Sequence, residues 1–265
     1  MSDERIITSL TNDTVKAVRA LSMRKEREAT GRFLAEGLKI IIDALDQGIA
    51  PVVLVYGKDA DHHPLLTRAI DATLAAKGEV LEVTHEILEK ISRKDNPQMV
   101  VAVFAQRIRR LDEIDPESHE VWVALEQVRD PGNLGTIIRT ADAAGAGGVI
   151  LIGDCVDPFS VETVRATMGS VFAVAVVRCT RDEFLADRGR WMGSVVGTLL
   201  SATHNHRTAP YRRPTLIVMG TEQSGLTPEI AGTCDLNVKI PMRGRADSLN
   251  LSVATGIMIY AASGL

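Results

Sequence analysis

Polar and glycine residues gather at three places in the second half of the sequence, each directly after a short apolar run. These segments, residues 130–142, 220–226 and 240–252, carry amide, carboxylate, hydroxyl and guanidinium groups. Short apolar runs are typical of strands buried in a parallel sheet, and open α/β sheets bind ligands at the carboxyl ends of their strands. The spacing therefore predicts three loops that converge on one binding site at strand ends.

Familiar nucleotide and metal sites do not fit this chain. The glycine cluster at residues 145–148 follows a predicted helix and precedes a predicted strand, which is the wrong order for a dinucleotide-binding turn. No GxxxxGK[ST] phosphate loop occurs, and the six histidines show no metal-ligand spacing. Cys155, Cys179 and Cys234 lie too far apart for a CxxC pair, so we expect reduced thiols and no metal.

Hydrophobic periodicity predicts an α/β protein with two parts. In the first part we expect helices over residues 14–28, 33–47, 64–77 and 86–91 and strands over 52–56, 80–83 and 99–104. In the second we expect strands over residues 121–125, 148–152, 171–177, 194–200, 216–219 and 236–240, with helices over 134–144, 160–168, 181–190 and 248–262. The strict alternation of the second part predicts a parallel sheet covered by helices on both faces.

A charged stretch with one proline divides the two parts. We expect residues 1–106 to form a smaller α/β domain, residues 107–118 a linker, and residues 119–265 the larger domain. No apolar run is long enough for a membrane span, and the first residues lack the apolar core of a signal peptide, so we expect a cytoplasmic protein.

Charge is distributed unevenly along the chain. The net charge is −4, which argues against a generally basic coat for nucleic acid. Residues 16–32 nevertheless hold six basic residues against two acidic ones, a net charge of +4. This run predicts either an exposed helix face or a local contact with phosphates.

Taken together, the three polar segments resemble the signature motifs of the SpoU-type RNA ribose 2′-O-methyltransferases, members of the SPOUT superfamily. The resemblance runs from residue 122 to residue 260. It implies transfer of a methyl group from S-adenosylmethionine to a ribose 2′-OH of structured RNA, with rRNA expected first and tRNA second. It also implies a trefoil knot in the second domain and a homodimer.

The resemblance assigns roles to particular side chains. It implies a catalytic set consisting of Asn133, Arg139, Glu222, Ser248 and Asn250. It implies that S-adenosylmethionine is held by Met219, Gly220, Thr221, Gly225, Ile240, Met242, Ser248 and Leu249. Thr221 stands where the family usually has asparagine, and Gln223 where it often has glycine.

Two roles for Arg139 stay open. An arginine remains protonated, which favours stabilisation of the developing alkoxide and a contact to phosphate over action as a base. Some accounts of the family nevertheless make the matching arginine the base.

The basic run in the first domain resembles the substrate-binding domain that precedes many SpoU-type enzymes. The resemblance implies phosphate contacts from Arg24, Lys25, Arg27 and Arg32. A non-catalytic RNA-binding or ribosome-assembly factor on the same scaffold is the alternative, and a base-N-methyltransferase is a weaker one.

The last predicted helix is apolar on almost every side. It also carries small residues four apart, at Ser248, Ser252 and Gly256. A helix of this kind should be buried on several sides, which favours a dimer interface over a single domain face.

Overall fold

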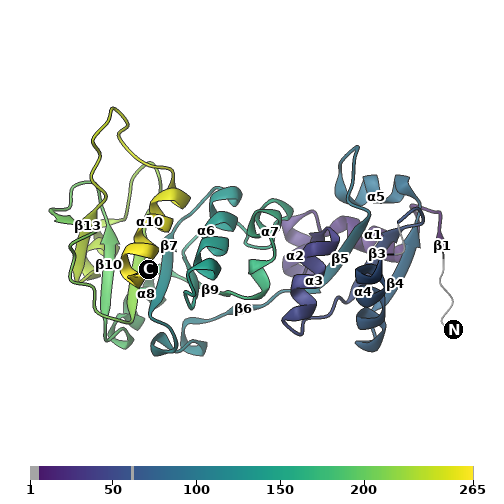
Figure 1. The fold of residues 1–265 in the computed structure, drawn as a ribbon, viewed down its shortest axis with the longest axis horizontal. Coiled ribbons are helices and arrows are strands. Elements are labelled where there is room, and N and C mark those ends of the chain that lie inside the picture. Colours follow the sequence, from purple (N-terminus) through teal and green to yellow (C-terminus); the bar gives the residue numbers. More distant parts are fainter. Residues whose placement is uncertain (1–5, 61–62, 265) are drawn as a thin grey trace. The chain divides into compact units, whose positions relative to one another are not determined.

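The computed structural model describes residues 6–60 and 63–264 and divides into two compact units. The N-terminal unit comprises Met1–Gln106 together with Phe159–Phe172, and the C-terminal unit comprises Arg107–Pro158 together with Ala173–Leu265. Each unit has its own sheet and its own core (Figure 1).

The N-terminal unit is built on a mixed five-stranded sheet with the order β1-β4-β3-β5-β2. Its strands are β1 (Ile6–Ile7), β2 (Arg32–Glu36), β3 (Val53–Gly57), β4 (Glu79–Val83) and β5 (Val100–Ala105). Strands β1, β4 and β3 pair in parallel, whereas β5 is antiparallel to both of its neighbours, β3 and β2.

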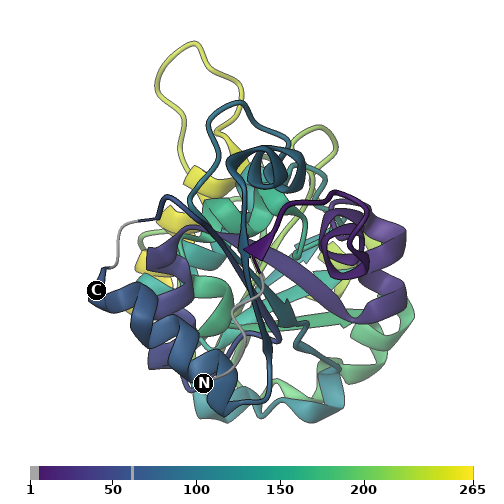
Figure 2. The same ribbon diagram turned by 90° about the vertical axis from the view of Figure 1, so that its right-hand side faces the viewer.

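Helices cover both faces of this sheet (Figure 2). One face is packed by α1 (Asp13–Ala20) and α5 (His85–Ser92), and the other by α3 (Leu38–Asp46) and α4 (Pro64–Ala75). The short helix α2 (Arg24–Thr30) lies between α1 and β2 in the chain. The α/β character expected from the sequence is therefore confirmed for this unit.

The predicted helix over residues 33–47 is wrong in its first part. Residues 38–46 do form a helix, but Phe33, Leu34 and Ala35 belong to β2 and are fully buried in the sheet. Gly37 separates the two elements with a φ of 99°, a conformation that favours glycine. The predicted helix over residues 14–28 is likewise interrupted, because α1 ends at Ala20 and α2 begins at Arg24.

A segment predicted to lie in the second domain belongs to the N-terminal unit instead. Residues 159–172 contain α7 (Val161–Thr167) and a 3₁₀ turn at Ser170–Phe172. Their aromatic rings join the N-terminal core, since the Phe159 ring lies 4.7 Å from that of Phe33. The Arg165 guanidinium also binds the Glu36 carboxylate at 2.8 Å, which adds a polar tether to the apolar one.

Residues 107–118 are not a free linker but part of the C-terminal unit. They contribute β6 (Ile108–Arg109), which pairs with β9, and two 3₁₀ turns. Leu111 and Ile114 are buried in the core of the C-terminal unit, and this apolar anchoring explains why the charged stretch is ordered.

The C-terminal unit contains an eight-stranded parallel sheet with the order β11-β13-β10-β12-β7-β8-β9-β6. Beyond β6, its strands are β7 (Val121–Glu126), β8 (Gly148–Ile152), β9 (Ala175–Cys179), β10 (Ser194–Thr198), β11 (His204–Asn205), β12 (Thr215–Met219) and β13 (Leu236–Lys239). The parallel sheet predicted from the alternating pattern is confirmed. The strand predicted over residues 171–177 begins later, at Ala175.

Two helices cover each face of this sheet. One core is formed with α6 (Pro131–Ala143) and α10 (Leu251–Ser263), and the other with α8 (Arg181–Asp187) and α9 (Pro228–Thr233). Helices α6 and α10 pack against each other as well, with Gly256 facing the methyl group of Thr140. Part of the small-residue stripe on α10 thus serves packing within the unit.

The three thiols are buried or half-buried and form no disulfide. Burial raises the pKa of the Cys179 and Cys234 thiols to about 12 and also raises the pKa of Cys155, so all three are protonated at neutral pH. Within residues 6–60 and 63–264, no helix has both the length and the apolar character to cross a bilayer. Those same residues contain no cluster of three or more His, Cys, Asp or Glu side chains suited to a metal ion.

Candidate active site

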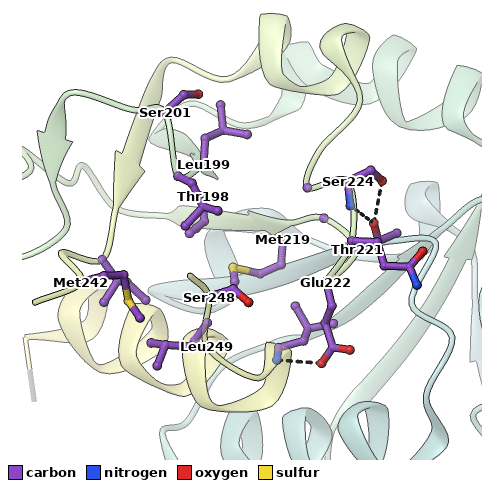
Figure 3. Close-up of a pocket in the computed structure, with 17 residues that line it drawn as sticks. Thr198, Leu199, Ser201, Met219, Thr221, Glu222, Ser224, Met242, Ser248 and Leu249 are labelled. Atoms are coloured by element: carbon purple, nitrogen blue, oxygen red, sulfur yellow. Dashed lines mark hydrogen bonds between the residues drawn. The ribbon is translucent and has the colours of Figure 1, made fainter. Parts of the chain in front are cut away.

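A pocket of about 320 Å³ opens at the carboxyl ends of three neighbouring strands of the C-terminal sheet, β13, β10 and β12 (Figure 3). Its walls come from the loops that follow these strands and from the start of α10. The volume falls in the range of about 300–1,000 Å³ that is usual for small-molecule sites. Two of the three predicted segments, 220–226 and 240–252, contribute to this lining, whereas no residue of 130–142 does.

The loop after β12 is a tight bend held by its own hydrogen bonds. Thr221 and Gly225 exchange two backbone hydrogen bonds, at 3.1 and 3.0 Å. The Thr221 hydroxyl accepts from the Ser224 backbone N–H at 3.1 Å and lies 2.7 Å from the Ser224 hydroxyl. Threonine at this position thus stabilises the bend (Figure 3).

Glu222 joins all three sequence segments through one carboxylate oxygen. Its Oε1 accepts from the Asn133 side-chain amide at 2.9 Å and from the Leu251 backbone N–H at 3.1 Å, and a longer contact of 3.4 Å comes from the Asn250 amide. The Asn250 amide also donates to Asn133 Oδ1 at 2.9 Å. These bonds connect the start of α6, the loop after β12 and the start of α10.

Local helix capping fixes the two asparagines in place. Asp130 is the N-cap of α6 and accepts from the Asn133 backbone N–H at 2.6 Å, which leaves the Asn133 side chain free to meet Glu222. Asn250 is the N-cap of α10, where its Oδ1 accepts from the backbone N–H groups of Ser252 and Val253. Asn133 is buried, whereas Glu222 and Asn250 are exposed.

Every residue that the sequence assigned to the methyl donor lines this pocket. The lining includes Met219, Gly220, Thr221, Gly225, Ile240, Met242, Ser248 and Leu249. Met219 ends β12, whereas Met242, Ser248 and Leu249 belong to the segment after β13, and all four surround the same space in Figure 3. From the catalytic set, Glu222 and Ser248 also line the pocket.

One wall of the pocket was missed from the sequence. It consists of Thr198, the last residue of β10, and of Leu199, Leu200 and Ser201, which follow that strand. No glycine or charged residue marks this stretch, and only its place at the end of an apolar strand signals it. The Thr198 hydroxyl is buried there and has no hydrogen-bond partner among the described residues.

These features fit S-adenosylmethionine as the occupant. An unpartnered buried hydroxyl favours a ligand with polar atoms. Leu199, Met219 and Met242 supply the apolar surface that an adenine ring requires.

Arg139 lies outside the pocket lining. It belongs to α6, its side chain is exposed, and it makes no hydrogen bond or ion pair with the described residues. The structure therefore does not bring Arg139 together with the Glu222 network. An exposed, unpaired guanidinium is available to a substrate phosphate.

The four cations proposed for RNA contact do not share one environment. Arg24, Lys25 and Arg32 are exposed. Arg27 is only 4% exposed and donates to the carbonyl oxygens of Leu21 and Ser22 at 2.8 and 2.9 Å. Its guanidinium satisfies carbonyls in the break between α1 and α2, so the expectation that Arg27 contacts RNA is wrong for this conformation.

Comparison with known proteins assigns both parts of the chain. Residues 120–260 match the SpoU rRNA Methylase family, and residues 12–102 match the MRM3-like substrate binding domain. The 23S rRNA (guanosine(2553)-2′-O)-methyltransferase RlmP of Bacillus subtilis is 31% identical, over 97% of this chain and 99% of the relative.

Solved structures agree with this assignment. The AdoMet-bound rRNA methyltransferase from Sinorhizobium meliloti has a TM-score of 0.90 and 50% identity, with 97% of each chain covered. The SpoU methyltransferase AviRb from Streptomyces viridochromogenes, in complex with the cofactor AdoMet, has a TM-score of 0.83 and 28% identity, covering 96% of this chain and 97% of that one.

The fold and the site thus define an RNA methyltransferase with a separate substrate-binding domain. The chain belongs to the SpoU rRNA methylase family, whose members transfer a methyl group from S-adenosylmethionine to a ribose 2′-OH. The family resemblance, the enzyme class and the methyl donor inferred from the sequence are confirmed.

Proposed function

We propose that this protein methylates the ribose 2′-OH of one nucleotide in 23S rRNA. Two observations support this proposal. All eight residues assigned to the methyl donor line one pocket, and residues 12–102 match a substrate-binding domain. Relatives named as 23S rRNA 2′-O-methyltransferases support rRNA over tRNA. A ribosomal substrate in turn supports the cytoplasm as the site of action. The trefoil knot stays a prediction.

Bound S-adenosylmethionine supplies an electrophilic methyl group, so the protein's task is to position an RNA hydroxyl in line with it. Positioning of this kind accounts for much of the rate of a bimolecular displacement. Through Asn133 and Asn250, the Glu222 network ties the start of α6 to two walls of the pocket, the loop after β12 and the start of α10. We therefore assign Glu222, Asn133 and Asn250 as positioning residues, and Ser248 in the pocket wall as a contact near the reacting atoms.

Arg139 completes the proposed machinery from outside the pocket. A ribose hydroxyl is a poor nucleophile, and its oxygen gains negative charge as the proton leaves. A guanidinium that binds the neighbouring phosphate stabilises that charge without itself losing a proton.

The proposed function makes two predictions. The protein should bind S-adenosylmethionine without a metal, and one 2′-O-methyl group in 23S rRNA should depend on the protein. Calorimetry in the presence of a chelator should show S-adenosylmethionine binding with unchanged affinity. Mapping of 2′-O-methyl groups in rRNA from cells with and without the gene should reveal a single position that depends on it. Donor binding without any missing methyl group would instead favour the non-catalytic assembly factor.

We also propose that the working unit is a homodimer formed through α10. Val253 and Tyr260 are 52% and 43% exposed, and Ile257 lies between them on the same face. This apolar strip runs along a helix whose opposite side already packs on α6 and the sheet. A strip of this kind suits a two-fold contact between identical surfaces.

Light scattering at micromolar concentration should give about twice the monomer mass of 28.7 kDa. The double variant Val253→Glu/Tyr260→Glu should be monomeric and inactive. Dimer formation would bury two unpaired carboxylates of each chain in the interface, whereas the core of the single chain is not disturbed because both positions are exposed. Met192→Glu is the matched control, since Met192 is 72% exposed and lies outside α10. A wild-type protein that stays monomeric and fully active on dilution contradicts the dimer.

A further inference from the structure

The N-terminal unit carries a cationic hollow between the ends of α1 and α5, two helices that pack side by side on the same face of its sheet (Figure 1). Two adjoining cavities, of about 320 and 240 Å³, make up this hollow. They share three lining residues, Arg19, Lys90 and Arg93. Arg19 lies in the last turn of α1, Lys90 in the last turn of α5, and Arg93 caps α5.

The three shared cations are unpaired. None of their side chains makes a hydrogen bond or an ion pair with any residue that the structure describes. The remaining two cations of the hollow are already engaged, because Lys16 binds Asp13 at 3.1 Å and Lys94 binds Glu36 at 3.0 Å. Charge therefore concentrates at the shared part of the hollow.

Neighbouring negative charge offsets these cations at the larger cavity but not at the smaller one. Glu89 and Asp95 border only the larger cavity, and Glu89 also faces the His85 imidazole at 3.5 Å. The smaller cavity has no acidic residue in its lining. At the smaller cavity, the ends of α1 and α5 add about −0.5 charge each, which is about one unit against the three unpaired cations. A local positive charge thus remains at the smaller cavity, on a chain whose net charge is −4.

We propose that this hollow binds the phosphate backbone of the RNA substrate and orients the RNA on the N-terminal unit. The proposal rests on the proposed function, because it takes RNA as the substrate. Cations distributed over two adjoining cavities suit a chain of phosphates better than one small anion. Met23, 49% exposed at the edge of the smaller cavity, adds apolar surface suited to a sugar or base.

The hollow differs from the cations that the sequence singled out. Arg24 is tied to Glu28 by an ion pair of 2.7 Å, and Arg27 is buried. Lys25 and Arg32 are exposed but line neither of these two cavities. If the hollow binds RNA, substitutions in the hollow should weaken RNA binding. If the cations singled out from the sequence bind it, substitutions at those cations should do so instead.

A charge-matched pair of triple variants separates them. One variant is Arg19→Gln/Lys90→Gln/Arg93→Gln, and the control is Arg24→Gln/Lys25→Gln/Arg32→Gln, which removes the same three charges from the same unit. Both keep Arg27 and the C-terminal unit intact. The probe is unmethylated 23S rRNA transcribed from the organism's own gene, with affinity measured from about 0.05 to 0.3 M salt.

We expect the first variant to bind the RNA at least about tenfold more weakly at 0.1 M salt, and the slope of log K against log salt to fall by about 2–3. This corresponds to a loss of roughly 0.7–0.9 per phosphate contact. Its affinity for S-adenosylmethionine and its thermal unfolding should match wild type. The control should keep most of its RNA affinity.

An unchanged salt slope for the first variant overturns the proposal. An equal loss of RNA affinity in the control also overturns it, because RNA binding would then depend on the total charge of the unit and not on the hollow. A wild-type protein that binds the rRNA but adds no methyl group refutes the proposed function alone, because the comparison of slopes still decides the hollow. A wild-type protein that does not bind the rRNA refutes the hollow as an RNA site.

Discussion

Arg139→Ala should reduce methyl transfer by about 10²–10³ while leaving S-adenosylmethionine affinity close to wild type. The side chain lies outside the donor pocket and is exposed on α6, so its loss removes no contact to the donor. A charged group that stabilises a developing oxyanion commonly contributes about 3–4 kcal/mol to the transition state. Single-turnover methylation of 23S rRNA and calorimetry with the donor measure the two effects separately.

Two further variants define what Arg139 does. Arg139→Lys keeps the charge but loses the planar fork, so it should recover only part of the rate if the guanidinium binds phosphate in a bidentate manner. Thr136→Ala is a control on the same exposed face of α6 and should be nearly neutral. Turnover near wild type in Arg139→Ala would show that the active site does not depend on this arginine.

The place of the donor pocket was predictable because two segments that contain glycines and polar residues each follow an apolar run, and strands of a parallel sheet bring such positions to one edge. The role of each residue toward the donor came from the family resemblance. The wall after β10 was not predictable in this way, since Leu199 and Leu200 have no chemical mark that separates them from ordinary loop residues.

Other differences arise because tertiary packing overrides local pattern. The hydrophobic spacing of the helix at residues 38–46 continues back over Phe33, Leu34 and Ala35, so the sequence predicts one long helix. The pairing of β2 with β5 makes these three residues a strand instead. The sequence of residues 159–172 looks like an ordinary crossover between two strands. Their place in the N-terminal core follows only from tertiary contacts, such as those of the Phe159 and Phe172 rings with Phe33. A basic run likewise shows charge but not burial, which is why Arg27 was misassigned.

Gly220→Ala should weaken donor binding by roughly 5- to 150-fold while most of the fold remains. Gly220 follows β12 directly and lines the pocket. A Cβ atom there would lie 2.0 Å from the carbonyl carbon of Gly225 and 2.2 Å from the Leu226 nitrogen. These are backbone atoms, so the bend must open. Opening it separates Glu222 from Asn133, and the three loops lose their common tie.

Forced overpacking of this kind costs about 1–3 kcal/mol, which corresponds to roughly a 5- to 150-fold loss of affinity where the strain falls on the site. Calorimetry with S-adenosylmethionine measures that loss, and thermal unfolding checks the fold. Gly232→Ala, in the exposed part of α9, is the matched control, because a Cβ there has no atom within 4 Å. Gly225→Ala tests the same bend differently, since its cost comes from a φ of 68° and not from a clash. If Gly220→Ala and Gly232→Ala bind S-adenosylmethionine with the same affinity, the closed bend after β12 is not required to hold the methyl donor.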